Sequence, residues 1–182
     1  IARGIIPGAL IGHSIGEYTA ACISGIMSLE DTLKLITARG FAMEEAEAGA
    51  MLSVNMTVDE AKTYIGSDSM ISLAVINSAK DVVLSGPENV IALAEKELTH
   101  TDTICRRVHV ARAFHSPMMD AAAEKLNRTI AAISFSPPQI PLVSNVSGTW
   151  LTEQQAQDKG YWPTHMKKTV LFADNLTAIL DD

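Results

Sequence analysis

The sequence is poor in the features that mark secreted, membrane-spanning or nucleic-acid-binding proteins. It has two cysteines, Cys22 and Cys105, whose spacing matches no disulfide framework or metal site, so we expect small buried thiols without chemistry. No apolar run reaches the roughly 18 residues that span a bilayer, and the first residues lack a signal peptide's pattern. The charge of -7, without a run of five like charges, and the 5% aromatic content argue against a nucleic-acid partner and against a basic helix on a membrane surface. We expect a cytoplasmic protein without a metal ion.

The remaining composition is that of a folded globule. The 182 residues are 47% apolar, which suffices for one well-packed domain or for a domain with a small satellite. No internal repeat or low-complexity tract interrupts them. The sequence begins at Ile1 and ends in LTAILDD without a closing motif, and we expect it to be a piece of a longer polypeptide.

Residues 12–16 read GHSIG, a serine between two glycines after an apolar run. Gly12 and Gly16 would leave room for a strained strand-to-helix turn that exposes Ser14. The backbone N–H of Ile15 would then lie at a helix N-terminus, where an oxyanion could form. This pattern predicts a nucleophile elbow, although GxSxG also occurs by chance in glycine-bearing loops.

The first and last thirds of the chain predict an α/β region. The expected elements are strands at 4–12 and 140–148 and helices at 15–25, 28–47, 116–134 and 172–182. Ser28 is expected to cap the second of these helices, and Gly25 to end the first. The apolar residues expected to share one face of the second helix are Leu29, Leu33 and Ile36.

The middle of the chain has a different period. Its expected elements are a strand at 50–56, a helix at 57–66, strands at 71–78 and 81–86, a helix at 87–101 and a strand at 103–110. The order βαββαβ is the ferredoxin-like arrangement. We therefore expect a small subdomain at 49–110, inserted into a large α/β subdomain made of 1–48 and 111–182.

A serine nucleophile needs a base, and the sequence offers five histidines: His13, His100, His109, His115 and His165. His115 is the best placed, because it follows the last strand of the small subdomain and precedes a loop-to-helix boundary. A capping or surface role is the alternative. The aspartates between Ser14 and His115 that could complete a hydrolase triad are Asp59, Asp68, Asp81 and Asp102, and none stands out from ordinary capping and turn residues.

Six segments resemble, in the same order, the acyltransferase domains of modular polyketide synthases, relatives of malonyl-CoA:acyl carrier protein transacylases. These segments are GHSIGEYTAAC, SLEDTLKLITARG, GAMLSV, NSAKDVVLSGP, ARAFHSPMMD and YWPTHMKKTVLF. The similarity spans nearly the whole chain. It implies an α/β-hydrolase-like core with an inserted ferredoxin-like subdomain, in agreement with the element order read from the sequence.

The resemblance also implies roles for particular residues. The nucleophile falls on Ser14 and the base on His115, which would work as a dyad whose histidine is oriented by backbone carbonyls. The carboxylate-binding arginine falls on Arg39, whose planar guanidinium can pair both oxygens of a malonyl group. Three further residues match positions in or beside the active site, with packing or surface roles as the alternative: His13, Asn77 and His165.

The residues before the base carry the family's extender-unit signature, in which HAFH accompanies malonyl and YASH methylmalonyl selection. Here the signature is RAFH, so Phe114 and also Ile15 fit the malonyl pattern. A ring there would crowd an α-methyl branch, which is worth about 1–3 kcal/mol of discrimination. Arg112 departs from the family's histidine. The family's GQGxQ segment and its C-terminal glycine motif are absent, so we expect an internal fragment that lacks one oxyanion donor.

The resemblance implies ping-pong transfer of a malonyl group from malonyl-CoA, through an ester on Ser14, to the phosphopantetheine thiol of an acyl carrier protein. It implies no bound cofactor, and it implies acyl-CoA, the carrier protein and a neighbouring ketosynthase domain as partners. Two alternatives stay open. A serine hydrolase or thioesterase would release acyl groups to water without preferring a carboxylate, and a catalytically inert docking fragment would only bind its neighbours.

Overall fold

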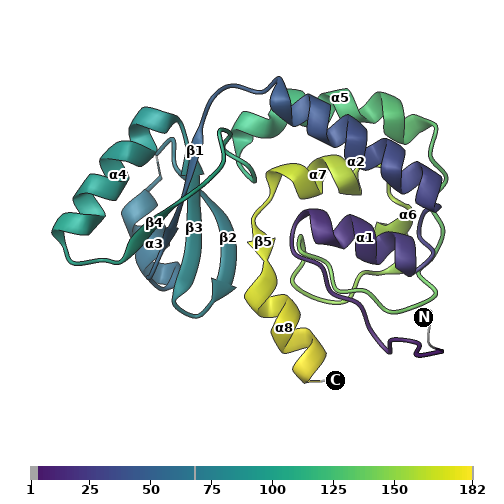
Figure 1. The fold of residues 1–182 in the computed structure, drawn as a ribbon. Helices are drawn as coiled ribbons and strands as arrows, with labels where there is room; N and C mark the ends of the chain where they lie inside the picture. The colour runs from purple at the N-terminus through teal and green to yellow at the C-terminus, as the bar shows by residue number, and fades with distance from the viewer. Residues whose placement is uncertain (1–3, 68, 182) are drawn as a thin grey trace.

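The structure is a computed structural model that describes residues 4–67 and 69–181. In chain order its elements are α1 (Ile15–Ile23), α2 (Leu29–Glu44), β1 (Ala50–Val54), α3 (Val58–Ile65), β2 (Ser72–Ser78), β3 (Asp81–Gly86), α4 (Glu88–His100), β4 (Cys105–Val108), the 3-10 turn η1 (Pro117–Met119), α5 (Asp120–Ala131), α6 (Glu153–Gln157), α7 (Tyr161–Lys167), β5 (Val170–Leu171) and α8 (Phe172–Leu180). They form two lobes: a sheet with α3 and α4, and a helical lobe built around α1, α2, α5 and α7 (Figure 1).

The sheet lobe contains the element order expected for the middle of the chain. Its strand order is β4-β1-β3-β2-β5, in which the first four strands pair antiparallel and β5 pairs parallel with β2. Alternation along the strands gives the sheet two apolar faces. Leu52 and Leu84 pack with Ile91 beneath α3 and α4, whereas Met51 and Val83 belong to the opposite face. The sequence did not predict β5, which is too short to carry a periodic signal.

Hydrogen-bonding side chains start the helices where the sequence places them. The Ser28 hydroxyl accepts the Asp31 N–H at 3.0 Å and begins α2, as expected. Thr57 and Glu60 form a reciprocal capping box at the start of α3, which ends before Gly66. These caps satisfy the backbone N–H groups that the first turn of a helix leaves unpaired.

The buried face of α2 is not the face that the sequence predicted. Leu29 and Leu33 are 66% and 56% exposed, whereas the helix buries Thr32, Leu35, Arg39, Ala42 and Met43. Apolar residues lie on both faces of this helix, so periodicity alone could not choose between them. The face that carries Arg39 packs inward because it meets α5 and α1.

Two expected strands are largely absent from the described residues. The segment 4–12 makes one parallel bridge, between Leu10 and Leu142, and its Ile6 is 77% exposed. The segment 140–148 bridges only through Leu142 and Val143 before it turns. Prolines in both segments lack the N–H that a central strand donates, and Gly148 turns the chain with φ +72°.

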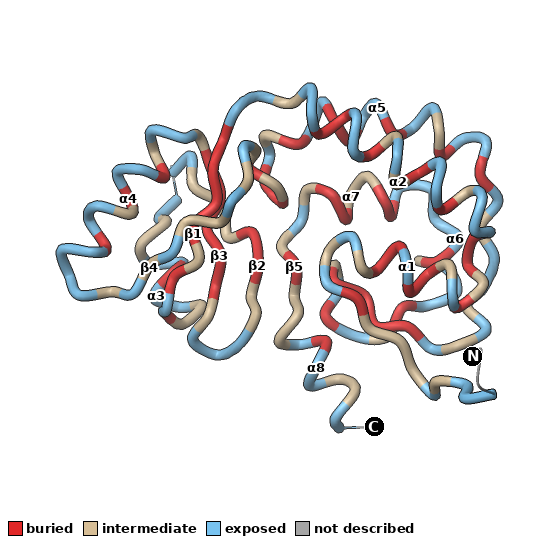
Figure 2. Tube along the Cα trace, in the orientation of Figure 1, coloured by how far each residue is buried: buried red, intermediate tan, exposed pale blue. Residues whose placement is uncertain are grey.

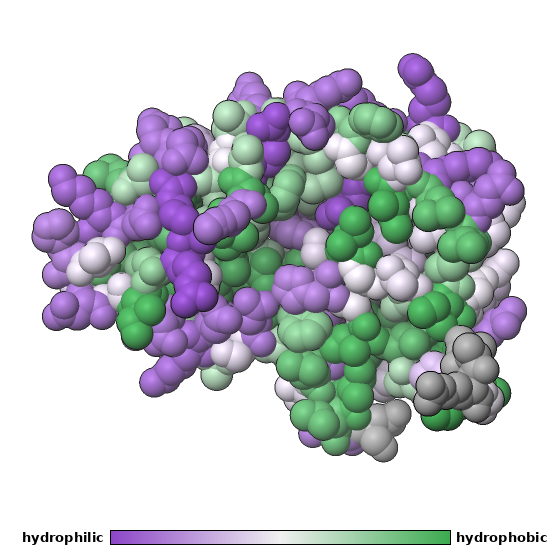
Figure 3. Space-filling view, viewed as in Figure 1, coloured by the Kyte–Doolittle hydropathy of each residue, from purple (hydrophilic) through white to green (hydrophobic). Residues whose placement is uncertain are grey.

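The helical lobe is closed by large side chains from α1, α2, α5 and α7. The largest fully buried ones include Trp162, Tyr18, Leu35, Leu126 and Met166. Buried positions also follow the central strands of the other lobe, so each lobe has its own core (Figure 2). Figure 3 shows a mostly hydrophilic sheet lobe and hydrophobic atoms over α8, where Leu180 is 81% exposed.

Gly12 is the glycine that the fold needs most. An added Cβ would lie 2.2 Å from the carbonyl carbon of Gly16 and 2.3 Å from the nitrogen of Glu17. These are backbone atoms of the first turn of α1, and they cannot move without disrupting the helix. We expect Gly12→Ala to lower the free energy of unfolding by about 3 kcal/mol or more.

Gly40 is the matched control, because it lies inside α2 and an added Cβ there would meet nothing within 4 Å. Gly40→Ala is expected to raise the free energy of unfolding by up to about 1 kcal/mol. Urea unfolding of both variants measures the difference. A Gly12→Ala variant as stable as the parent would contradict the close approach.

Candidate active site

Ser14 lies on a strained corner immediately before α1. Its backbone has φ 49° and ψ -115°, a conformation that costs a non-glycine residue about 1–3 kcal/mol. The turn is closed by bonds from the Gly16 N–H to the His13 carbonyl and from the Glu17 N–H to the Ser14 carbonyl. Gly12 provides the space that the sequence predicted, but a Cβ at Gly16 would meet nothing within 4 Å, so the expected need for room at Gly16 is wrong.

A buried asparagine that the sequence analysis missed holds this corner. The Oδ1 atom of Asn145 accepts the N–H of Ser14 at 2.8 Å, and its Nδ2 atom donates to the carbonyl of Gly12 at 2.7 Å. Nδ2 also donates to Asn175 Oδ1 at 2.7 Å. Asn145 is 1% exposed, so these bonds are shielded from water. The only sequence signal was an amide two residues after the apolar pair at 142–143.

Glu17 anchors Asn145 from below. Its carboxylate is fully buried and accepts the backbone N–H of Asn145 at 2.8 Å and the hydroxyl of Tyr161. Burial and the nearby Glu17 raise the pKa of Tyr161 far above its usual value, so the phenol stays protonated and donates. A buried carboxyl group is costly unless it is hydrogen-bonded, and that of Glu17 accepts both of these hydrogen bonds.

His115 faces the hydroxyl of Ser14 from the segment that precedes η1. Its Nε2 atom lies 2.7 Å from Ser14 Oγ, and its Nδ1 atom lies 3.0 Å from the carbonyl of Lys168. A carbonyl can only accept, so Nδ1 carries the proton and Nε2 accepts from the serine. The backbone carbonyl of Lys168 therefore orients this imidazole.

The surroundings of His115 keep it neutral. Burial lowers its pKa to about 3, with further contributions from His165 and Arg39, against a smaller opposing effect of the Lys168 carbonyl. Because the folded-state pKa lies below the ordinary value of about 6.5, the imidazole stays uncharged throughout the neutral range, with its one proton on Nδ1. Its Nε2 atom is free to take a proton from Ser14.

Arg39 reaches the same serine from α2. Its Nη2 atom lies 3.4 Å from Ser14 Oγ, and its guanidinium carbon lies 5.4 Å from the centre of the Tyr18 ring. The residue is 6% exposed, and its Nε atom has no hydrogen-bond partner within residues 4–67 and 69–181. A buried guanidinium with an unused donor, next to a serine hydroxyl, can bind an anion.

Ser14 and His115 open onto a cavity of about 200 Å3 between the lobes. Its other lining residues are His13, Met51, Val75, Val83, Val108, Val110 and Phe114. The walls are therefore apolar and come mainly from the sheet, while the reactive groups come from the helical lobe. Such a space suits a small acyl group held over the hydroxyl.

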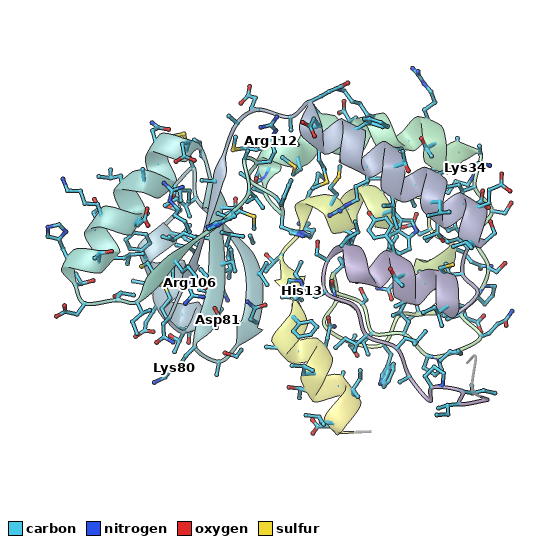
Figure 4. All side chains as sticks on the ribbon, viewed as in Figure 1. His13, Lys34, Lys80, Asp81, Arg106 and Arg112 are labelled. Atoms are coloured by element: carbon cyan, nitrogen blue, oxygen red, sulfur yellow. The ribbon has the colours of Figure 1, made fainter. Side chains whose placement is uncertain are left out.

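The remaining predicted residues take separate places. His13 lies where the two lobes meet (Figure 4), and its Nε2 atom is 3.0 Å from Asn77 Oδ1. The side-chain amide of Asn77 donates to Asp81 at 3.2 Å. His165 is not at the cavity but buried behind His115, with the ring centroids 6.0 Å apart and its Nε2 atom 3.3 Å from Glu17 Oε2. The N–H of Ile15 donates no hydrogen bond within the described residues.

Residues 4–67 and 69–181 hold no cluster of three or more metal-binding side chains, and Cys22 and Cys105 are free thiols. Within the same residues no helix is both long enough and apolar enough to cross a bilayer.

Comparison with known sequences decides the family. Residues 1–182 match the sequence profile described as acyl transferase domain. The chain belongs to this acyl transferase family. Among curated relatives, this acyl transferase domain is 34% identical to the spectinabilin polyketide synthase system protein NorB of Streptomyces orinoci, over 97% of this chain and 8% of that protein. It is 32% identical to the polyketide synthase GfsA of Streptomyces halstedii, over 97% of this chain and 2% of that protein.

Solved structures show the same fold. The acyl transferase domain of SpnD, in complex with 2-(pent-4-yn-1-yl)malonyl, has a TM-score of 0.93 and 34% identity, over 99% of this chain and 43% of that one. The malonyl CoA-acyl carrier protein transacylase from Clostridium perfringens has a TM-score of 0.90 and 28% identity, over 99% and 59%. The acyl transferase domain thus spans about half of these solved chains and a small part of the curated relatives.

The role of Asn145 in the acyl transferase domain can be tested by truncation. Asn145→Ala would leave the Ser14 N–H and the Gly12 carbonyl without their buried partner. We expect the free energy of unfolding to fall by about 2–4 kcal/mol. Asn127→Ala, at an exposed position of α5, is the control and is expected to change it by less than about 0.5 kcal/mol. Equal effects of the two substitutions in chemical denaturation would contradict the assignment.

Proposed function

We propose that this domain transfers a malonyl group from malonyl-CoA to the phosphopantetheine thiol of an acyl carrier protein through an ester on Ser14. One observation carries the proposal: Ser14 Oγ lies 2.7 Å from a neutral imidazole and 3.4 Å from a buried guanidinium. The imidazole can activate the hydroxyl, and the guanidinium can hold the carboxylate that distinguishes malonyl from acetyl. We therefore assign catalytic roles to Ser14 and His115 and a binding role to Arg39.

In the first half-reaction His115 Nε2 takes the proton of Ser14, and Oγ attacks the thioester carbonyl carbon. The carbon–sulfur bond then breaks, and the CoA sulfur leaves with the proton from His115. In the second half-reaction the carrier thiol gives its proton to His115 and attacks the ester carbonyl. The carbon–oxygen bond breaks, and Ser14 Oγ recovers the proton, so the enzyme returns to its starting state.

The N–H of Ile15 is proposed to donate a hydrogen bond to the carbonyl oxygen as negative charge develops on that oxygen in both steps. It lies at the first residue of α1, where the helix dipole favours negative charge, and its donor is unused within residues 4–67 and 69–181. One donor of this kind is worth about 3–4 kcal/mol in catalysis.

Selection for an unbranched malonyl group is assigned to Phe114, which lines the small cavity together with four valines from the sheet side. A methyl branch would have to displace one of these side chains, at about 1–3 kcal/mol. His13 and Asn77 are proposed to border the entrance, because their contact spans the two lobes. The buried position of His165 supports an electrostatic influence on His115.

We assign the lobes to an α/β-hydrolase-like large subdomain, at 1–48 and 111–182, and a ferredoxin-like small subdomain at 49–110. The strand order β4-β1-β3-β2 and the flanking α3 and α4 support the second assignment. The proposed partners are acyl-CoA, an acyl carrier protein and a ketosynthase domain of the same polypeptide, without a bound cofactor and in the cytoplasm. Matches to polyketide synthases support these partners.

A serine hydrolase is the rival that shares this geometry. The buried position of Arg39 beside Ser14 favours the transferase, because a hydrolase of simple acyl esters has no use for a buried cation there. A purely docking function does not account for the hydrogen bond between Ser14 and His115, because binding a neighbouring domain does not require a serine paired with a buried imidazole.

The proposed function predicts acylation of Ser14. Brief incubation with malonyl-CoA should add one malonyl group to the protein, detected by intact-protein mass spectrometry, and Ser14→Ala should remove the adduct. Methylmalonyl-CoA should react at least about 10-fold more slowly than malonyl-CoA. Turnover to free malonate without an adduct would favour the hydrolase, and no reaction with any thioester would favour the docking function.

The proposed function also predicts that Arg39 recognises the carboxylate of the substrate. Arg39→Ala should lower kcat/KM for malonyl-CoA about 100-fold or more, because a charge-assisted bidentate contact is lost. Acetyl-CoA, which has no carboxylate, should react as fast as before or faster. Arg128→Ala, an exposed arginine on α5, is the matched control. Equal losses for both thioesters would contradict carboxylate recognition.

A further inference from the structure

Arg112 replaces the histidine expected before the base, and its side chain does not enter the catalytic cavity. Its Nη2 atom donates to the carbonyl of Glu44 at 2.5 Å, and its Nη1 atom donates to the carbonyl of Ala111 at 2.9 Å. Glu44 is the last residue of α2, so one guanidinium joins the end of this helix to the segment that leads to His115. In Figure 4 the Arg112 label lies where the two lobes meet.

The chain enters the sheet lobe at 45–49 and returns at 109–113 (Figure 1), and these two segments touch one another beside Arg112, at Gly49, Ala111 and Ala113. The Gly49 N–H donates to the carbonyl of Ala111 at 3.1 Å. A Cβ added at Gly49 would lie only 2.8 Å from Ala113, so the backbones are in close contact. Arg112 therefore closes a junction that is already tightly packed.

The end of α2 lacks a cation of its own. No basic residue lies in its last turn, although the terminal carbonyls carry partial negative charge. Arg112, 68 residues later in the chain, supplies that charge together with a hydrogen bond. Because Arg39 is on the same helix, anything that fixes the end of α2 also restrains the guanidinium beside Ser14.

The two arginines also border one space. A cavity of about 370 Å3 is lined by Arg39, Arg112 and Phe114, among others. Phe114 also lines the catalytic cavity. Both guanidinium groups have a buried Nε atom without a hydrogen-bond partner within the described residues. Moving the Arg112 guanidinium would therefore change the surroundings of the Arg39 guanidinium.

We propose that Arg112 is a positioning residue that holds the C-terminal end of α2 and thereby keeps Arg39 in register with Ser14 for carboxylate binding. The proposal rests on the proposed function, because it assigns Arg112 an effect on substrates that carry a carboxylate. It places no atom of Arg112 on the substrate.

The test is the rate of acyl-enzyme formation against thioester concentration, followed by intact-protein mass spectrometry. Arg112→Ala should raise the half-saturating concentration of malonyl-CoA about 10-fold while the maximal rate changes less than about threefold. The half-saturating concentration of acetyl-CoA should not change. Arg112→Lys, which keeps the charge but not the fork of donors, should give an intermediate rise and serves if Arg112→Ala does not fold. Arg128→Ala is the matched control.

The double variant separates positioning from a general structural effect. In the Arg39→Ala background, Arg112→Ala should add no further rise for malonyl-CoA, because the group it positions is gone. Additive effects would overturn the proposal. So would an equal rise for acetyl-CoA, or a fall in the maximal rate alone, which indicates a loss of folded enzyme.

Failure of this inference and failure of the proposed function give different results. If Arg39→Ala weakens malonyl-CoA binding but neither Arg112 variant does, only the positioning role is overturned. If Arg39→Ala does not change the half-saturating concentration of malonyl-CoA, Arg39 does not bind the carboxylate. The proposed positioning role of Arg112 is then overturned as well.

Discussion

The backbone of Ser14 can hold its strained corner because a buried amide is hydrogen-bonded to it. Asn145 accepts the Ser14 N–H and donates to the Gly12 carbonyl, and Glu17 in turn fixes the Asn145 backbone. These bonds lie beneath the turn, in a region closed to water, where an unmade bond costs about 1–3 kcal/mol. The network therefore offsets the strain at Ser14 and leaves the hydroxyl pointing into the cleft.

The site is assembled from both lobes and from distant parts of the chain. α1 and α2 bring Ser14 and Arg39, the return segment from the sheet brings His115, and the Lys168 carbonyl orients it. The sheet contributes an apolar wall that keeps the cavity small. The cavity therefore has polar groups on one side and an apolar wall on the other. This arrangement suits acyl transfer, in which the acyl chain is held in place while its carbonyl carbon exchanges one bond for another.

Sequence reasoning found the residues whose signals are local. Gly12, two residues before Ser14, and the Ser28 cap of α2 each lie within a few residues of what they determine. Asn145 was missed because its partner is 131 residues away, and the inward face of α2 was missed because both faces of that helix are apolar. Arg39 was found through a family resemblance, since an arginine near a helix end is usually solvated.

We propose that a neutral, buried His115 removes the proton of Ser14. The most direct measurement is the pH dependence of kcat/KM for acylation by malonyl-S-N-acetylcysteamine, a thioester without phosphate groups that titrate near neutrality. With the pKa of His115 lowered to about 3, the rate should hold nearly constant from about pH 7 down to about pH 5. A rate that falls about 10-fold per pH unit below about pH 6.5 would show an ordinary, solvated imidazole and contradict the account.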